Sequence, residues 1–182
     1  AQAFSLLAGY EAYVTVQNSD CVVSHYFQCA EDLADAKNCV SFSENDHIYK
    51  GTTGDEPQWI FSHHIADEIT ETREPRPFDR ASFSGLIAMG VNDSYFRTMS
   101  SEVGVTRYVG RDTLTGNQVV IDGVTLDETL YDLTAYLEDG TQIWQSQGHE
   151  FISRDWRMFL SGKGSITTLS DTFETDGTPV QF

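Results

Sequence analysis

The stretch GNQVVIDGVTLDETLYDLTAYLEDGTQIWQSQGHEFIS, residues 116–153, contains two Asp-Gly pairs, each flanked by residues that favour extended chain. Asp-Gly is the strongest short signal for a β-hairpin, because its two-residue turn needs positive φ at both central positions. A turn at Asp122-Gly123 pairs Ile121 with Val124 and places the neighbouring apolar side chains on one face. The sequence therefore predicts an antiparallel hairpin here.

The same construction at Asp139-Gly140 predicts a second hairpin, with Trp144 on an apolar face. The expected cross-strand pairs are Leu137 with Gln142, Ala135 with Trp144, Leu133 with Ser146 and Tyr131 with Gly148. Small and polar residues on an otherwise apolar face are typical of the inner wall of a ligand-holding half-barrel. A packed core whose gaps are filled by other elements is the alternative.

The apolar residues change parity between Leu126, on the even face, and Tyr131, on the odd face. Because side chains alternate strictly along a strand, this change predicts a bulge or a break near 127–129. A bulge bends a sheet, and a bent sheet can wrap around a ligand.

Further strand patterns precede residue 116. Residues 5–17, SLLAGYEAYVTVQ, carry apolar side chains on one parity, and residues 21–29, CVVSHYFQC, read as a second strand. A hairpin is expected about Asn45 and Asp46. Residues 58–70, QWIFSHHIADEIT, fit a strand or a helix, and the adjacent aromatic residues favour the strand.

Two short helices are expected in the middle of the chain. Asp79 is a candidate cap for a helix over 80–89 that ends at Gly90, and Asp93 is a candidate cap for a second over 94–101. After them, another hairpin is predicted about Lys163-Gly164. The polar tail that follows reads as an irregular or edge segment.

Together these patterns predict one domain over residues 1–182, mainly β. It is a single curved antiparallel sheet or open half-barrel of roughly nine or ten strands, with two short helices inserted near the middle. This order of elements resembles the periplasmic lipoprotein carriers and related lipid-binding folds, in which short helices close a curved antiparallel sheet. The resemblance implies lipid binding, concerns element order alone and assigns no residue.

The composition narrows the function classes. Eleven Lys and Arg against 28 Asp and Glu give a net charge of -17, which disfavours nucleic acid and anionic membranes as partners. No run approaches the ~18 apolar residues of a membrane span, so no membrane insertion is expected. The opening AQA fits the small-residue pattern at a signal-peptide cleavage site and predicts a periplasmic or secreted protein.

Three cysteines allow one disulfide. On a strand, Cys21 and Cys29 would lie roughly 26 Å apart, far beyond the ~7 Å Cα limit for a disulfide. The segment after Cys29 can return the chain, so the sequence predicts a bridge between Cys29 and Cys39, with Cys21 left as a buried thiol. The spacing lacks the close Cys pair of a zinc site.

Two polar clusters are candidates for chemistry. His63, His64, Asp67 and Glu68 could hold a metal ion if the segment were helical. His149, Glu150 and Arg154 form the most catalytic-looking patch and would serve a hydrolase or metal-dependent enzyme. No nucleophile or phosphate-loop motif supports either.

The leading prediction is an exported, non-enzymatic binding or carrier protein for an apolar or amphipathic small molecule, with no cofactor. The expected ligand-binding residues are Tyr131, Leu133, Leu137, Trp144, Ser146 and Arg154. An enzyme that uses one of the two clusters is the first alternative, and a structural or partner-binding module is the second.

Overall fold

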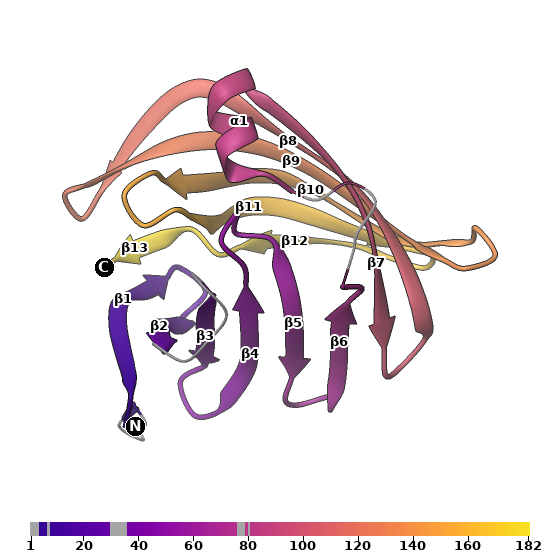
Figure 1. The fold of residues 1–182 in the computed structure, drawn as a ribbon, viewed down its shortest axis with the longest axis horizontal. Helices are drawn as coiled ribbons and strands as arrows, with labels where there is room; N and C mark the ends of the chain where they lie inside the picture. The colour runs from indigo at the N-terminus through magenta and orange to yellow at the C-terminus, as the bar shows by residue number, and fades with distance from the viewer. Residues whose placement is uncertain (1–3, 7, 30–35, 76–78, 80) are drawn as a thin grey trace.

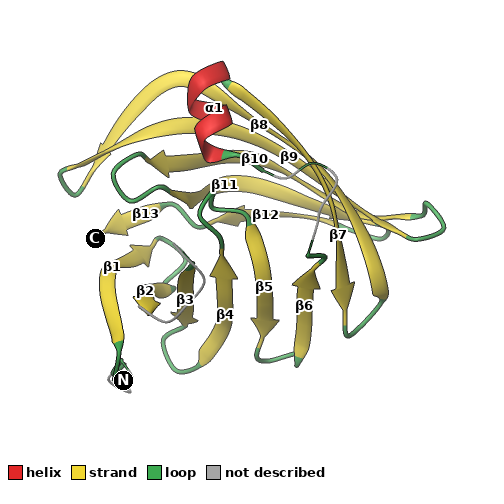
Figure 2. Ribbon diagram, viewed as in Figure 1, coloured by secondary structure: helices red, strands yellow, loops and turns green. Residues whose placement is uncertain are grey.

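The computed structural model describes residues 4–6, 8–29, 36–75, 79 and 81–182. In these residues the chain forms one 13-stranded antiparallel sheet and one helix (Figures 1 and 2). The first six strands are β1 (Tyr10–Asn18), β2 (Val23–Cys29), β3 (Lys37–Phe42), β4 (His47–Thr53), β5 (Trp59–His64) and β6 (Ile69–Arg73). After α1 (Phe83–Met89) come β7 (Val91–Ser100), β8 (Gly104–Ile121), β9 (Val124–Leu137), β10 (Gln142–Ser153), β11 (Met158–Thr168), β12 (Thr172–Asp176) and β13 (Pro179–Gln181).

Twelve of the strands follow one another as a meander, and β13 then pairs with β1. The consecutive strands β12 and β13 therefore stand at opposite ends of the sheet order, joined by Gly177 and Thr178. The sheet curls on itself without closing as a barrel. This confirms the predicted curved, open antiparallel sheet, but the predicted number of nine or ten strands is too low.

The two halves of the sheet differ in strand length. The strands β7–β11 have 10 to 18 residues, whereas β1–β6 have five to nine. In Figure 1 the long strands arch over the short ones, which hang below them. The interior of the molecule lies between the two halves.

The Asp122-Gly123 hairpin forms as predicted. Ile121 pairs with Val124, and φ is 48° at Asp122 and 80° at Gly123, the positive values that a two-residue turn of this type requires. The two-residue turn thus sets the pairing of the apolar residues on either side of it, as expected.

At Asp139-Gly140 the turn is longer than predicted. Only Gly140 has positive φ, and the amide of Leu137 bonds to the carbonyl of Thr141, so three residues form the loop. Gln142 consequently pairs with Tyr136 rather than with Leu137. Further from the turn, the predicted pairs of Ala135 with Trp144, Leu133 with Ser146 and Tyr131 with Gly148 are confirmed.

The parity change in β9 has a different origin from the one predicted. β9 runs unbroken through 127–129, and the bulge lies in its partner β8, between Leu114 and Gln118, where Gly116 has φ of 84°. Apolar residues lie on both faces of β9: Leu126 packs into the main core on one face, and Tyr131 lies on the other face.

One of the two predicted helices is present. α1 is capped by Ser82, whose hydroxyl accepts from the amide of Gly85, and ends at Gly90 with φ of 77°. Asp79 is not its cap but forms an isolated bridge with Tyr95. No helix among the described residues has the length and hydropathy to cross a membrane.

The second predicted helix, over 94–101, is wrong because that segment forms most of β7. Its polar residues Ser94, Thr98 and Ser100 are buried at alternating positions, which is the period of a strand. Within residues 58–70, the favoured strand forms as β5, a turn occupies 65–68, and the start of β6 completes the hairpin. The tail contributes the edge strands β12 and β13.

The predicted hairpin about Lys163-Gly164 is also wrong, since β11 is continuous there. Its glycines serve close approach rather than a turn. A Cβ at Gly164 would clash with the hydroxyl of Tyr131, and a Cβ at Gly148 of the neighbouring strand β10 would clash with the carbonyl oxygen of Lys163. A bulge in β11 between Ser161 and Gly164, opposite Gly148 and Glu150 of β10, accompanies this close packing.

The three cysteines are free thiols, so the predicted disulfide is not formed. Cys39 pairs with Tyr26, three residues before Cys29, and an odd offset places the two sulfurs on opposite faces of the sheet. Cys21 is exposed, with φ of 65° in the turn before β2, rather than buried as predicted.

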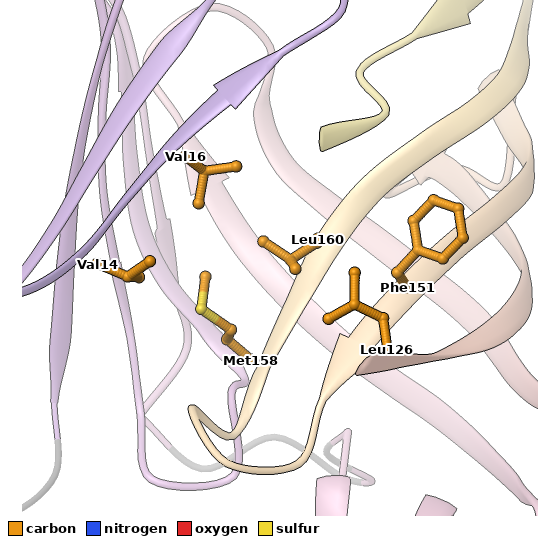
Figure 3. Packing of buried hydrophobic residues seen from close by; sticks show 6 residues of the cluster. All are labelled: Val14, Val16, Leu126, Phe151, Met158 and Leu160. Atoms are coloured by element: carbon orange, nitrogen blue, oxygen red, sulfur yellow. The ribbon is translucent and has the colours of Figure 1, made fainter. Parts of the chain in front are cut away.

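Two apolar clusters form the core, and the first of them joins the short strands to the long ones. In the main core, β1 turns its side chains toward those of β9, β10 and β11 (Figure 3). Its buried members are Val14, Val16, Leu126, Phe151, Met158 and Leu160. The second cluster joins Phe83 and Leu86 of α1 to Ile152, with Leu114 and Phe159 packed against it. α1 therefore covers one end of the long strands.

Candidate ligand-binding site

A cavity of about 230 Å³ lies against the long strands, and we name it the carboxyl cavity. Its apolar wall includes Trp59, Phe96, Leu133 and Phe159. Its polar groups include Gln58, Arg73, Asp112, Tyr131 and Glu150. Residues from both halves of the sheet and from the segment before α1 thus meet at this cavity.

Three neighbouring strands bring the acidic groups together. Asp112 of β8 pairs with Tyr131 of β9, and Tyr131 pairs with Gly148 of β10. Glu150 lies two residues beyond Gly148 on the regularly paired strand β10 and therefore on the same face. Phe159, packed edge-on to Phe83 of α1 at 5.8 Å, closes the neighbouring wall.

The two carboxyl groups titrate abnormally. Burial, reinforced by the negative charge of Asp112, raises the pKa of Glu150 to about 8, and burial raises the pKa of Asp112 to about 6. No described residue donates a hydrogen bond to either side chain. Both carboxyls are therefore held in the protein without the donors that usually stabilise a buried carboxylate.

The aromatic wall is itself well supported. Phe96 stacks on Tyr108 with ring centroids 5.0 Å apart, and Trp59 packs against both rings. The hydroxyl of Tyr108 donates to Glu71 over 2.7 Å. Beside this wall, the guanidinium of Arg73 donates to the amide oxygen of Gln58. These contacts fix the shape of the cavity.

Two further cavities adjoin the carboxyl cavity through shared lining residues. A bridging cavity of about 180 Å³ shares Tyr131 and Glu150 with the carboxyl cavity. A third, of about 670 Å³, shares Ser161 and Gly177 with the bridging cavity, and we name it the hydroxyl cavity. Its polar groups include Ser24, Tyr26, Cys39, Ser41 and Tyr49.

The hydroxyl cavity is polar but internally bonded. The hydroxyls of Ser24 and Ser41 lie 2.8 Å apart, and the thiol of Cys39 lies 3.7 Å from the hydroxyl of Ser41. Burial raises the pKa of Cys39, although hydrogen bonds from Ser41 and Tyr26 partly oppose this. Burial also raises the pKa of Tyr49 to about 12, so these groups stay neutral at physiological pH.

The six predicted ligand-binding residues separate into three groups. Tyr131 and Leu133 line the carboxyl cavity, and Ser146 lies within hydrogen-bond distance of the hydroxyl of Tyr131, at 3.0 Å. Trp144 packs on Tyr108 at 5.6 Å, behind the aromatic wall, and Leu137 is further along β9 opposite Thr106. Arg154 lies apart, paired with Asp127.

The two predicted polar clusters do not converge. His149 and Glu150 are adjacent on β10 and face opposite sides, and His149 pairs with Glu128 at 3.1 Å. His63 and His64 likewise alternate on β5, with Asp67 and Glu68 in the turn beyond. Nowhere in the described residues do three or more His, Cys, Asp or Glu side chains gather closely enough to hold a metal ion.

Sequence reasoning missed Asp112, Trp59 and Phe96, and it placed Glu150 in the wrong cluster. If β8 continued from Ile121 without a bulge, the register would set Asp112 opposite Leu133. The bulge shifts Asp112 by two residues to face Tyr131. The position of Asp112 is thus fixed by a bulge that the sequence does not signal.

No protein-family model matches this chain, and no curated protein and no solved structure matches it either. The resemblance to lipoprotein carriers in element order therefore stays a prediction, and the function must be inferred from the site.

Proposed function

We propose that this protein is a binding or carrier protein that holds a small amphipathic molecule in the carboxyl cavity. The observation that carries the proposal is a cavity whose wall is mainly apolar and aromatic but which also contains the carboxyls of Asp112 and Glu150. Sites for small molecules combine an apolar wall with a few placed polar groups in this way.

The energetics favour a site over a defect of packing. A desolvated carboxyl without donors costs free energy that a Leu in its place would not, and such groups concentrate at functional sites. Two of them border the same cavity, which strengthens the inference. An amphipathic molecule would cover the aromatic wall with its apolar part and reach the carboxyls with its polar part.

A second candidate function is acid–base catalysis by Asp112 and Glu150. Two carboxyls whose pKa values are pushed apart, here to about 6 and about 8, can serve as base and acid. Turnover of an ester, phosphate or glycoside that is lost in both Asp112→Asn and Glu150→Gln would favour this enzyme over a carrier.

The carrier proposal is tested by comparing the intact mass of the gently purified protein under native and denaturing conditions. We expect an additional mass that disappears on denaturation, or, for protein purified empty, saturable binding of 1-octanol by calorimetry. Ala81→Trp, which fills the cavity wall, should abolish the binding, whereas Ala88→Trp on the exposed face of α1 should not. Binding that survives Ala81→Trp would contradict this location.

A further inference from the structure

We infer that the molecule held in the carboxyl cavity carries a cationic amine, and that this ammonium group lies between Asp112 and Glu150. The inference rests on the proposed function and names the chemical class of its ligand. It follows from the position of the two acids in one cavity, from the aromatic residues of its wall and from the lack of hydrogen-bond donors to the two carboxyls among the described residues.

Glu150 is the more informative of the two groups. It is partly buried, borders both the carboxyl cavity and the bridging cavity, and receives no hydrogen bond from a described residue. Asp112 lines the same cavity from the next strand but one. An ammonium ion supplies both the positive charge and the several N–H donors that the described residues do not provide to these two carboxyls.

The walls select an organic cation over a metal ion. Trp59, Phe96, Tyr131 and Phe159 line the cavity, and aromatic faces attract ammonium groups through cation–π contacts. A calcium ion would need six or more oxygen ligands, whereas the described residues contain no group of three or more His, Cys, Asp or Glu side chains that could hold a metal ion. The apolar wall also suits the hydrocarbon part of an amine.

Two described cationic residues of the wall, Arg111 and Arg73, oppose this inference. Arg111 is exposed and paired with Asp93 at 2.6 Å, and the guanidinium of Arg73 donates to the amide oxygen of Gln58. The pKa values of Asp112 and Glu150 are both raised rather than lowered, so Arg73 does not neutralise them. An anionic ligand would instead use Arg73 and would be repelled by the two acids.

Binding of an amine should be coupled to proton release. Among the described residues, the titratable and charged groups that line the two cavities with Glu150 are Asp20, Arg73, Arg111, Asp112, Tyr131, Asp132 and Asp176. Among them, Asp112 joins Glu150 in having a carboxyl pKa raised toward neutrality, while Asp176 has one lowered to about 2. At pH 7 a bound ammonium would displace the proton of Glu150, and an alcohol would not.

The experiment compares n-octylamine, 1-octanol and octanoate by isothermal titration calorimetry at pH 7 in two buffers of different ionisation enthalpy. We expect the amine to bind at least tenfold more tightly than the alcohol and to release about one proton. Equal affinities for amine and alcohol would overturn the inference and leave the carrier proposal standing. Tightest binding of octanoate would overturn it in favour of Arg73 as the anchor. Failure of all three probes would contradict both proposals.

Variants make the assignment specific. Glu150→Gln should weaken octylamine binding about tenfold and abolish the proton release, whereas Glu174→Gln on the exposed strand β12 should change neither. Asp112→Asn provides an independent variant if Glu150→Gln fails to fold, with a smaller loss of affinity in the same direction. An unchanged preference for the amine in either variant would overturn the inference.

Discussion

The carboxyl cavity and the hydroxyl cavity bury polar groups in opposite ways. In the hydroxyl cavity, Ser24 and Ser41 bond to one another, and Cys39 lies beside Ser41. In the carboxyl cavity, Asp112 and Glu150 have no donors from the described residues, and each is an acid beside another acid. The first region is complete without a ligand, whereas the second gains stability only if something is bound or if its acids stay protonated.

The largest effect should come from replacing Glu150. Because its folded pKa is about 8 and its ordinary value is 4.5, the folded state binds the extra proton between these values. Stability is therefore greatest below about pH 4.5 and falls as the pH rises through 8, by a few kcal/mol in total. Glu150→Gln should match the wild type at pH 5 and exceed its free energy of unfolding at pH 9.

Urea denaturation of both proteins between pH 5 and pH 9 measures this difference. Glu174→Gln is the matched control, since that carboxyl is exposed on an edge strand. A wild-type stability that is flat over this range would show that Glu150 is not desolvated.

A smaller effect is expected in the hydroxyl cavity. Ser41→Ala leaves the buried hydroxyl of Ser24 without its partner and should cost about 1–2 kcal/mol of unfolding free energy. The double variant Ser24→Ala with Ser41→Ala should cost less than the sum of the two single changes, because no unpaired hydroxyl remains. The loss of unfolding free energy should be independent of pH between 5 and 9. A loss that depends on pH would contradict the view that this hydroxyl pair, unlike the two carboxyls, does not titrate in this range.

The smallest effect concerns a carboxylate that does have donors. The carboxylate of Glu56 accepts the amide and hydroxyl of Ser84 at the start of α1, both at 2.7 Å, and pairs with Arg157 at 3.1 Å. Although burial alone would raise its pKa, the bonds from Ser84 and the charge of Arg157 leave that pKa below its ordinary value.

Glu56 should therefore respond to pH with the opposite sign to Glu150. Its stabilisation is present above the ordinary pKa of 4.5 and is lost as the pH falls through the lower folded value. We expect Glu56→Gln to reduce stability by about 1 kcal/mol at pH 7 and by much less at pH 3. Thermal unfolding at the two pH values measures this, and an equal loss at both would mean that the charge is irrelevant.

The sequence predicted the regular parts of the molecule well. The Asp122-Gly123 turn and the pairing of Trp144 with Ala135 follow from turn chemistry and alternation, which act locally. The error over 94–101 arose where a helix cap signal at Asp93 competed with tertiary pairing, and pairing with β6 and β8 decided the outcome.

The site was less predictable because non-local register positions it. Tyr131 and Leu133 could be assigned to an inner wall from their own hairpin. Asp112 needed knowledge of the bulge at Gly116, and Trp59 and Phe96 needed the packing of β5 beside the long strands. Glu150 was predicted as part of a catalytic patch with His149, but alternation along β10 places their side chains on opposite faces.

The most direct test of this account is a carbon-13 NMR titration of the Glu150 carboxyl, assigned by its loss in Glu150→Gln. The account predicts a midpoint near pH 8 in the free protein, since burial and Asp112 both raise this pKa. Saturating octylamine should lower that midpoint by at least one unit, because the bound ammonium favours the carboxylate. A midpoint between 4 and 5 in the free protein, unchanged by the amine, would contradict it.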